Sequence, residues 1–361
     1  MTTGTASRPL VNSLTAGKLP KGMSWVILGA SLAIFLGIFY FMDLAGSIDG
    51  FNWILATVIG VFVFVLANYV IALLVEGRRP ATDRLVTSLV SGAFVLALIP
   101  LVWLVVTVVQ NGLPTLLNGT FLTNSMWNVV GAGGGALHAI VGTLIITGIA
   151  ALISVPIGLL TAIYLVEYGR GRLARGITFF VDVMTGIPSI VAGLATFALF
   201  VIFFGAGVKM GFAGSVALSI LMIPVVVRST EEVLKLVPNE LREASYALGV
   251  PKWLTILKVV LPTSTAGITT GIMLSISRVI GETAPLLIVA GFATSMNYNP
   301  FSERMQSLPV FTYNQYVSPG TDAQAYFDRA WAGALTLIII VALLNAIARI
   351  VSHYFSPKLG R

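Results

Sequence analysis

The sequence predicts an all-α membrane protein whose chain crosses the bilayer about eight times. Of its 361 residues, 57% are hydrophobic and only 10% are charged, whereas about a quarter of the residues in soluble domains are charged. Several apolar segments reach the roughly 20 residues that an α-helix needs to span the hydrocarbon core. Composition therefore excludes a soluble globular protein and indicates a polytopic one.

Eight apolar segments are predicted to be spans. They are Trp25–Met42, Phe51–Val75, Leu85–Val109, Ala136–Val166, Ile177–Phe204, Phe212–Val227, Gly267–Val289 and Ala332–Val351. The first is expected to be retained, because no convincing small-residue cleavage site follows it. The fourth is longer than a span requires and contains Pro156, which predicts a tilt or a kink.

The distribution of Lys and Arg predicts the orientation of these spans, since cytoplasmic loops are enriched in basic residues. Alternating spans place most of the basic residues on one side: Arg8, Lys18, Lys21, Arg78, Arg79, Arg84, Arg170, Arg172, Arg175, Arg228, Lys235, Arg242, Lys252, Lys258, Arg349, Lys358 and Arg361. The opposite side holds Lys209, Arg304 and Arg329, and Arg278 lies inside a span. Both termini are therefore expected in the cytoplasm.

Several classes of function are disfavoured by the residues present. The net charge of +7 comes from short loops and not from a basic patch with aromatic platforms, so no nucleic-acid partner is expected. The chain has no cysteine, and His138 and His353 form no credible catalytic or metal-ligand pattern. The only Gly-Lys pair, Gly17-Lys18, is not part of a phosphate-binding loop of the Walker A type. We expect no catalytic residue, metal or cofactor on this chain.

Residues 239–262, NELREASYALGVPKWLTILKVVLP, form the one long polar interruption that also has the pattern of ordered helix. Asn239 is a suitable N-cap, Gly249 has the position of a left-handed C′ residue, and Pro251 is suited to begin a second short helix. Two short helices at a sharp angle would dock onto a protein outside the membrane. An amphipathic connector on the lipid surface is the alternative.

Charged residues occur at membrane depth in the segment from Leu274 to Pro285. Arg278 and Glu282 are four apart, so on a helix they share a face and can pair. Ser277 and Thr283 add hydroxyl groups, and Pro285 loosens the preceding turn. Intramembrane charges usually face a bundle interior or a hydrated pathway. An ion pair that only fixes helix packing is the alternative.

This pair suggests a hypothesis about the transported solute. An Arg guanidinium can donate two parallel hydrogen bonds to a tetrahedral oxyanion. Glu282 would neutralise Arg278 in the empty state and would favour an anion that carries a proton. Phosphate at neutral pH keeps a proton, whereas sulfate does not.

Four further positions are candidates for the pathway or its inner end. Arg228 is either a second anion contact or an interfacial side chain that reaches the headgroups. Asp182 is suited to cap or to pair near the inner interface, and Pro188 and Ser189 would loosen the fifth span toward the pathway. Two polar segments, 110–135 and 295–329, are either partner surfaces or solvated outer loops with interfacial tyrosines.

Residues 243–262 resemble the cytoplasmic coupling loop of ABC importer permeases, written EAA, three residues, G, nine residues, I-x-L-P. The matching positions here are Glu243, Ala244, Ser245, Gly249, Val259, Leu261 and Pro262, with Ser245 and Val259 replacing Ala and Ile. In that family the loop docks into a cleft of a separate ATPase, and the resemblance implies the same here.

Further runs between residues 100 and 352 resemble the permease subunits of the phosphate-specific ABC importer, and the PstA type more closely than the PstC type. These are AIVGTL at 139–144, PIG at 156–158, YLVEYG at 164–169, GIPSIV at 186–191, VVRSTEE at 226–232 and RVIGETAPLL at 278–287. The resemblance supports Arg228, Arg278 and Glu282 as pathway residues.

The resemblance also implies an architecture and an assembly. A type I importer core of six helices would comprise a first helix and outer loop at 85–135 and the transmembrane domain at 136–352, with a short cytoplasmic tail at 353–361. Two extra helices within residues 1–84 depart from the family and are not explained by it. The implied partners are a second permease of the PstC type, two ATPase subunits that carry ATP and Mg²⁺, and an extracytoplasmic phosphate-binding protein.

The sequence thus predicts a permease subunit of an ATP-driven phosphate importer in a bacterial plasma membrane. Another oxyanion, sulfate or molybdate, is the nearest alternative as cargo. A channel or carrier that works without an ATPase is a second alternative, and an intramembrane enzyme is a remote third.

Overall fold

The computed structural model describes residues 17–46 and 50–355, and the basic residues Arg8, Lys358 and Arg361 lie outside these ranges. Seven of the described helices are long and apolar enough to cross a membrane, and a bent pair makes eight if it counts as one span. The helices of these seven spans are α1 (Met23–Leu44), α2 (Trp53–Val75), α3 (Arg78–Leu117), α5 (Leu137–Ile163), α8 (Gly211–Lys235), α11 (Leu261–Val279) and α14 (Ala323–Phe355). The span of α5 continues to Tyr168, and the span of α11 begins at Lys252. The prediction of an all-α protein with about eight spans is confirmed.

Shorter elements connect these helices. The bent pair consists of α6 (Gly171–Thr185) and α7 (Ser189–Phe204). The others are α4 (Thr120–Thr123), the π-helical turn η1 (Tyr164–Tyr168), α9 (Asn239–Ala247), α10 (Lys252–Thr255), the π-helical turn η2 (Ile256–Val260), α12 (Ala284–Val289) and α13 (Leu308–Val317).

The chain divides into two compact units, residues 1–104 and 105–361. In the first unit, α1 and α2 form a hairpin that packs through small residues such as Ala56, Gly60 and Ala72. Arg84 donates to Glu76 at 2.8 Å. Burial by itself would raise the pKa of Glu76, but the Leu19 amide and the Arg84 guanidinium outweigh this effect and hold that pKa below its ordinary value.

Helix α8 is the central helix of the second unit, because 61% of its apolar 18-residue stretch is buried. It packs on α5, and the core between them contains Ile146, Leu218 and Met222. Ser215 of α8 donates to the Ile146 carbonyl at 3.0 Å across this contact. Small and hydroxyl-bearing residues let membrane helices approach closely, which explains their frequency along α8.

Two segments that were predicted as single spans are broken. The segment Ile177–Phe204 divides into α6 and α7, whose axes differ by 108°. Pro188 begins α7 as its N-cap, and a residue that precedes a proline is disfavoured in helical conformation. The segment Gly267–Val289 divides into α11 and α12, and residues 280–283 between them are not α-helical. Both breaks lie beside the same cavity and shape it. The continuous apolar runs of the sequence did not reveal these breaks.

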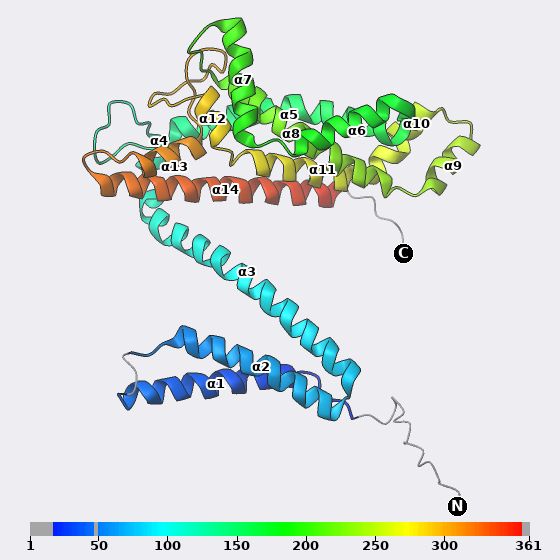
Figure 1. Cartoon of the computed structure of the whole chain (residues 1–361). Helices are drawn as coiled ribbons and strands as arrows, with labels where there is room; N and C mark the ends of the chain where they lie inside the picture. The colour runs from blue at the N-terminus through cyan, green and yellow to red at the C-terminus, as the bar shows by residue number, and fades with distance from the viewer. Residues whose placement is uncertain (1–16, 47–49, 356–361) are drawn as a thin grey trace, which may run out of the picture. The chain divides into compact units, whose positions relative to one another are not determined.

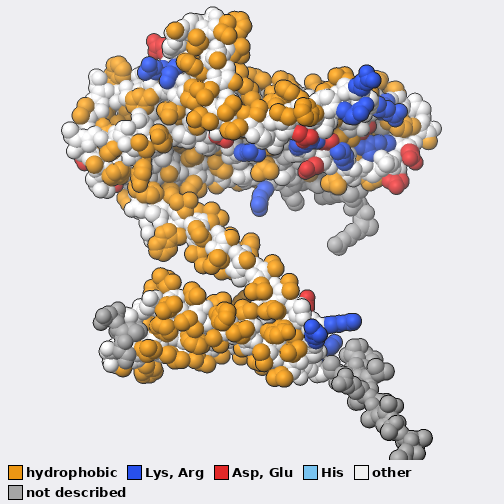
Figure 2. All heavy atoms as spheres, in the orientation of Figure 1, with side chains coloured by type: hydrophobic (Ala, Val, Ile, Leu, Met, Phe, Trp, Pro, Cys, Tyr) orange, Lys and Arg blue, Asp and Glu red, His pale blue; other side chains and the backbone are white. Residues whose placement is uncertain are grey.

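The two ends of the second unit differ. Helices α9 and α10 lie at one end, and α4, α12 and α13 lie toward the other (Figure 1). Lys and Arg side chains gather at the end that carries α6, α9 and α10 (Figure 2). Apolar side chains cover much of the visible surface between the ends, as expected for a surface in contact with lipid.

Candidate functional site

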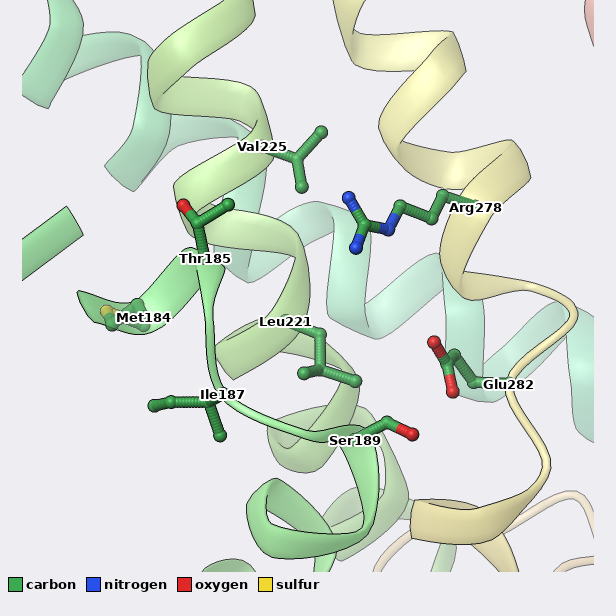
Figure 3. A pocket seen from close by; sticks show the side chains of 8 residues that line it. All are labelled: Met184, Thr185, Ile187, Ser189, Leu221, Val225, Arg278 and Glu282. Atoms are coloured by element: carbon green, nitrogen blue, oxygen red, sulfur yellow. The ribbon is translucent and has the colours of Figure 1, made fainter. Parts of the chain in front are cut away.

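A cavity of about 200 Å³ lies where the two broken segments meet α8. Its lining residues are Met184, Thr185, Ile187, Ser189, Leu221, Val225, Arg278 and Glu282. The first four come from the bend between α6 and α7, the next two from α8, and the last two from the end of α11 and the segment after it. Figure 3 shows the Arg278 guanidinium and the Glu282 carboxylate on the same side of this space.

Arg278 and Glu282 are brought together, but not as a helical ion pair. Helix α11 ends at Val279, and the Glu282 amide donates to the Val279 carbonyl at 3.1 Å in the turn that follows. Within the described ranges, no ion pair of 4.0 Å or less joins the two side chains. The prediction that they share a helix face and pair is therefore wrong, because the helix ends between them. Both charged groups remain available to a ligand in the cavity.

The other predicted pathway residues differ in position. Ser189 lines the cavity at the first turn of α7. Ser277 is not among the lining residues, and its hydroxyl donates to Asn345 of α14 at 3.3 Å. Thr283 is the N-cap residue of α12 and also lies outside the lining. The cavity thus brings together Arg278, Glu282 and Ser189 from the predicted set.

Arg228 lies next to the cavity and is held by carboxylates. It donates to Glu231 at 2.7 Å and also pairs with Asp182 of α6. Val225 precedes Arg228 by three residues and lines the cavity, as does Thr185, three residues after Asp182. Since three residues are almost one helical turn, the Arg228–Asp182 pair lies about one turn from the cavity on both helices. Arg228 was predicted to be either an anion contact or an interfacial side chain, and neither role includes an ion pair with these carboxylates.

A second functional region is the loop 239–262. The cap residue of α9 is Pro238 without a side-chain bond, so the prediction of Asn239 as the N-cap is wrong; Asn239 is the first helical residue. Likewise Pro251 caps α10, which begins one residue later than predicted. Proline is well suited to a position next to a helix start, where its missing N–H costs no helical bond.

The turn between α9 and α10 is a Schellman motif. The Gly249 amide donates to the Tyr246 carbonyl at 2.9 Å, and the Val250 amide donates to the Ser245 carbonyl at 3.2 Å. Gly249 has φ +73°, in the left-handed region that its predicted C′ position requires. The buried Ser245 and Thr255 hydroxyls lie 2.8 Å apart and tie α9 to α10.

The exposed surface of this loop suits a partner. Glu243 and Ala244 are exposed, and so are the larger apolar side chains of Leu248, at 83%, and Trp253, at 58%. The π-helical turn η2 directly precedes α11, whose first two residues are Leu261 and Pro262. Proline cannot donate to the preceding turn, and a wider π-helical turn is one way to accommodate this loss.

Glu167 joins this loop to the end of α5, and sequence reasoning did not identify this role. Arg242 of α9 donates to the Glu167 carboxylate at 2.9 and 3.0 Å, and the exposed fractions of their side chains are 12% and 5%. Lys252 contacts the Glu167 carbonyl and lies 4.9 Å from the centre of the Tyr168 ring. The available signal was one acidic residue at the end of a long uncharged segment.

Comparisons with known proteins identify the family to which this chain belongs. Residues 154–361 match the model of the family described as "Binding-protein-dependent transport system inner membrane component". The chain is 48% identical over 276 residues to "Phosphate transport system permease protein PstA 1" of Mycobacterium tuberculosis strain H37Rv, an alignment that covers 76% of this chain and 88% of that protein. It is 40% identical over 277 residues to "Phosphate transport system permease protein PstA" of Pasteurella multocida, covering 75% and 95%.

Among solved structures, the chain is similar to a chain of the inward-facing MetNI methionine ABC transporter. The sequence identity is 20%, the TM-score is 0.48, and the match covers 62% of this chain and 95% of that one. Because the family model matches more than half of the chain and close relatives cover three quarters of it, the chain belongs to the family of binding-protein-dependent transport system inner membrane components.

Proposed function

We propose that this chain is a permease subunit of an ATP-driven phosphate importer and forms half of its transmembrane pathway. The observation that carries the proposal is the cavity in which the Arg278 guanidinium and the Glu282 carboxylate face the same space without pairing. The two relatives named above are both phosphate transport system permeases, which supports phosphate as the cargo.

The two side chains suit a protonated oxyanion. The guanidinium only donates hydrogen bonds, and an ionised carboxylate only accepts them. Phosphate at neutral pH can accept from Arg278 with its bare oxygens and donate its remaining proton to Glu282. Sulfate has no proton to donate and would be repelled by the carboxylate. Ser189 adds a hydroxyl that can serve as either partner.

Replacing Glu282 by Gln tests this assignment. Because a hydrogen bond to a charged group contributes about 1.5–3 kcal/mol, phosphate uptake should fall by roughly 10-fold or more and the preference over sulfate should shrink. The measurement is uptake of labelled phosphate by the reconstituted importer with sulfate as competitor. Glu282→Asp, which keeps the carboxylate, should retain the preference at a lower rate. An unchanged preference in Glu282→Gln would exclude this role.

Arg228 is proposed to contribute to the pathway beside the cavity, where its guanidinium pairs with Asp182 and Glu231. An anion that leaves the cavity past this pair would compete with the carboxylates for Arg228. We assign Arg228 and Asp182 to the inner end of the pathway on this ground.

The loop 239–262 is proposed to dock onto a separate ATPase subunit. Its exposed Leu248 and Trp253 provide apolar contacts, and the Schellman motif and the Ser245–Thr255 contact make the loop a rigid unit. Movement of the ATPase on binding and hydrolysing ATP would move α9 and, through Arg242 and Glu167, the end of α5. Such rigid-body motion would expose the cavity to alternate sides.

Replacing Gly249 by Val is expected to uncouple uptake from ATP hydrolysis. A β-branched residue at φ +73° costs about 1–2 kcal/mol or more, so the Schellman turn should rearrange. The expected result is at least a severalfold drop in phosphate transported per ATP hydrolysed by the purified complex. Gly249→Asn, a residue that tolerates the left-handed region, is the matched control and should stay near the parent value. Equal ratios for both variants would contradict the coupling role.

The assembly and its orientation complete the proposal. The end with α9 and α10 faces the cytoplasm, with both chain termini on that side of a bacterial plasma membrane. The partners are a second permease of the PstC type, two ATPase subunits and an extracytoplasmic phosphate-binding protein. Affinity purification in mild detergent tests this composition. Phosphate flux in liposomes that contain this chain without any ATPase would instead favour an independent channel or carrier.

A further inference from the structure

A second, open depression of about 500 Å³ adjoins the carboxyl end of α12. Its lining includes Lys209, Thr294, Glu303 and Arg304. In Figure 2 a small group of Lys and Arg side chains with an acidic neighbour lies near the loops beside α7 and α12, at the end of the unit opposite α9. These loops are far from the region assigned to ATPase docking.

The backbone on both sides of the depression is fixed by the end of α12. The Met210 amide donates to the Val289 carbonyl at 3.0 Å, and the Met305 amide donates to the Ala290 carbonyl at 3.2 Å. Lys209 and Arg304 directly precede these two anchored residues. The Asn297 side chain also donates to the Arg304 carbonyl at 3.2 Å. Both basic residues are thus held by ordered backbone, although they lie almost a hundred positions apart in the sequence.

The two basic side chains approach each other over one glycine. A Cβ atom at Gly291, whose φ is +79°, would lie 2.9 Å from Lys209 Cδ and 3.4 Å from Arg304 Cδ. Because Gly291 has no side chain, the aliphatic parts of Lys209 and Arg304 can both lie over it. No ion pair of 4.0 Å or less links Lys209 or Arg304 to a carboxylate in the described part of the chain. Glu303 offsets one of the two positive charges of the lining.

A favourable interaction with the dipole of helix α12 does not account for the positions of Lys209 and Arg304. The carbonyls of Val289 and Ala290 at the end of that helix already accept amide hydrogen bonds. The helix has only six residues and spans about 9 Å. Glu282, which lines the cavity beside Arg278, lies two residues before Ala284, at which α12 begins, so the depression and the cavity adjoin opposite ends of one short helix.

We propose that Lys209 and Arg304 bind inorganic phosphate at the outer mouth of the pathway, before it reaches Arg278. Two adjacent cations on a fixed backbone attract a divalent oxyanion and raise its local concentration. The direction of transport in this statement rests on the proposed function, whereas phosphate binding in the depression does not.

The chain contains no cysteine, so a single Thr294→Cys substitution places one thiol of this chain in the depression. In the assembled importer without ATP, a negatively charged methanethiosulfonate should label this thiol about 10-fold faster than in a Lys209→Gln, Arg304→Gln background. Millimolar phosphate should slow labelling severalfold relative to chloride at equal ionic strength, and this protection should vanish in the double variant. Glu303→Gln should strengthen it. Thr120→Cys, an exposed position on α4, should show no protection.

Several outcomes would overturn the proposal. One is labelling that phosphate does not slow, and another is protection that persists in the double variant. Protection by the soluble binding protein but not by phosphate would instead assign the depression to protein docking. Phosphate uptake by the double variant should fall about 10-fold at low phosphate, and unchanged uptake would remove the site from the pathway. Arg278→Gln should lower uptake about 100-fold or more and leave protection intact, which separates failure here from failure of the proposed function.

Discussion

Replacing Arg278 by Gln is expected to lower phosphate uptake by about 100-fold or more, because it removes two charge-assisted hydrogen bonds of about 1.5–3 kcal/mol each. The guanidinium faces the cavity with no carboxylate partner within the described residues, so its full hydrogen-bonding capacity is available to the anion. Arg278→Lys keeps the charge but loses the planar fork, and we expect an intermediate loss of roughly 10-fold. Uptake of labelled phosphate by the reconstituted importer measures both.

The matched control for Arg278 is its neighbour Ser277. The Ser277 hydroxyl bonds to Asn345 of α14 and does not line the cavity, so Ser277→Ala should change uptake by no more than about 5-fold, the factor that a neutral hydrogen bond of about 1 kcal/mol represents. Arg278→Gln that transports at the parent rate, in a complex that still assembles, would show that the anion does not meet this guanidinium.

Replacing Glu167 by Gln is expected to reduce both the stability of the coupling region and the phosphate transported per ATP. The substitution leaves the half-buried Arg242 guanidinium without its carboxylate, and breaking a largely buried ion pair in this way costs up to about 3 kcal/mol. Arg242 also donates to the Val237 and Leu234 carbonyls, so its side chain cannot move to solvent without further loss. The connection between α9 and the end of α5 should therefore loosen.

A double variant separates the ion pair from general damage. Glu167→Gln combined with Arg242→Met removes the stranded cation and should recover about 1 kcal/mol or more relative to Glu167→Gln alone. Thermal unfolding of the purified complex and the ratio of phosphate transported to ATP hydrolysed are the readouts. Glu240→Gln, an exposed acidic residue on the same helix, is the control and should change neither. If the losses of stability from the two substitutions were additive in the double variant, the Glu167–Arg242 ion pair would not be what connects α9 to the end of α5.

Some features were already determined by residue type and spacing. Apolar length is set by bilayer thickness, so the number of spans could be predicted without knowing their contacts. Gly249 could be placed at a left-handed C′ position because few residues tolerate positive φ. Arg278 and Glu282 could be assigned to one site, since charges at membrane depth need a polar environment.

Tertiary structure alone decided how these residues meet. Hydropathy does not distinguish a continuous apolar helix from two helices joined by a bend, so the 108° bend before Ser189 and the end of α11 at Val279 were hidden. Because α11 ends at Val279, Glu282 lies beside the cavity and not on the same helical face as Arg278. Contacts between distant positions, Arg242 with Glu167 and Lys209 with Arg304 over Gly291, depend on packing across many residues, for which local periodicity carries no signal.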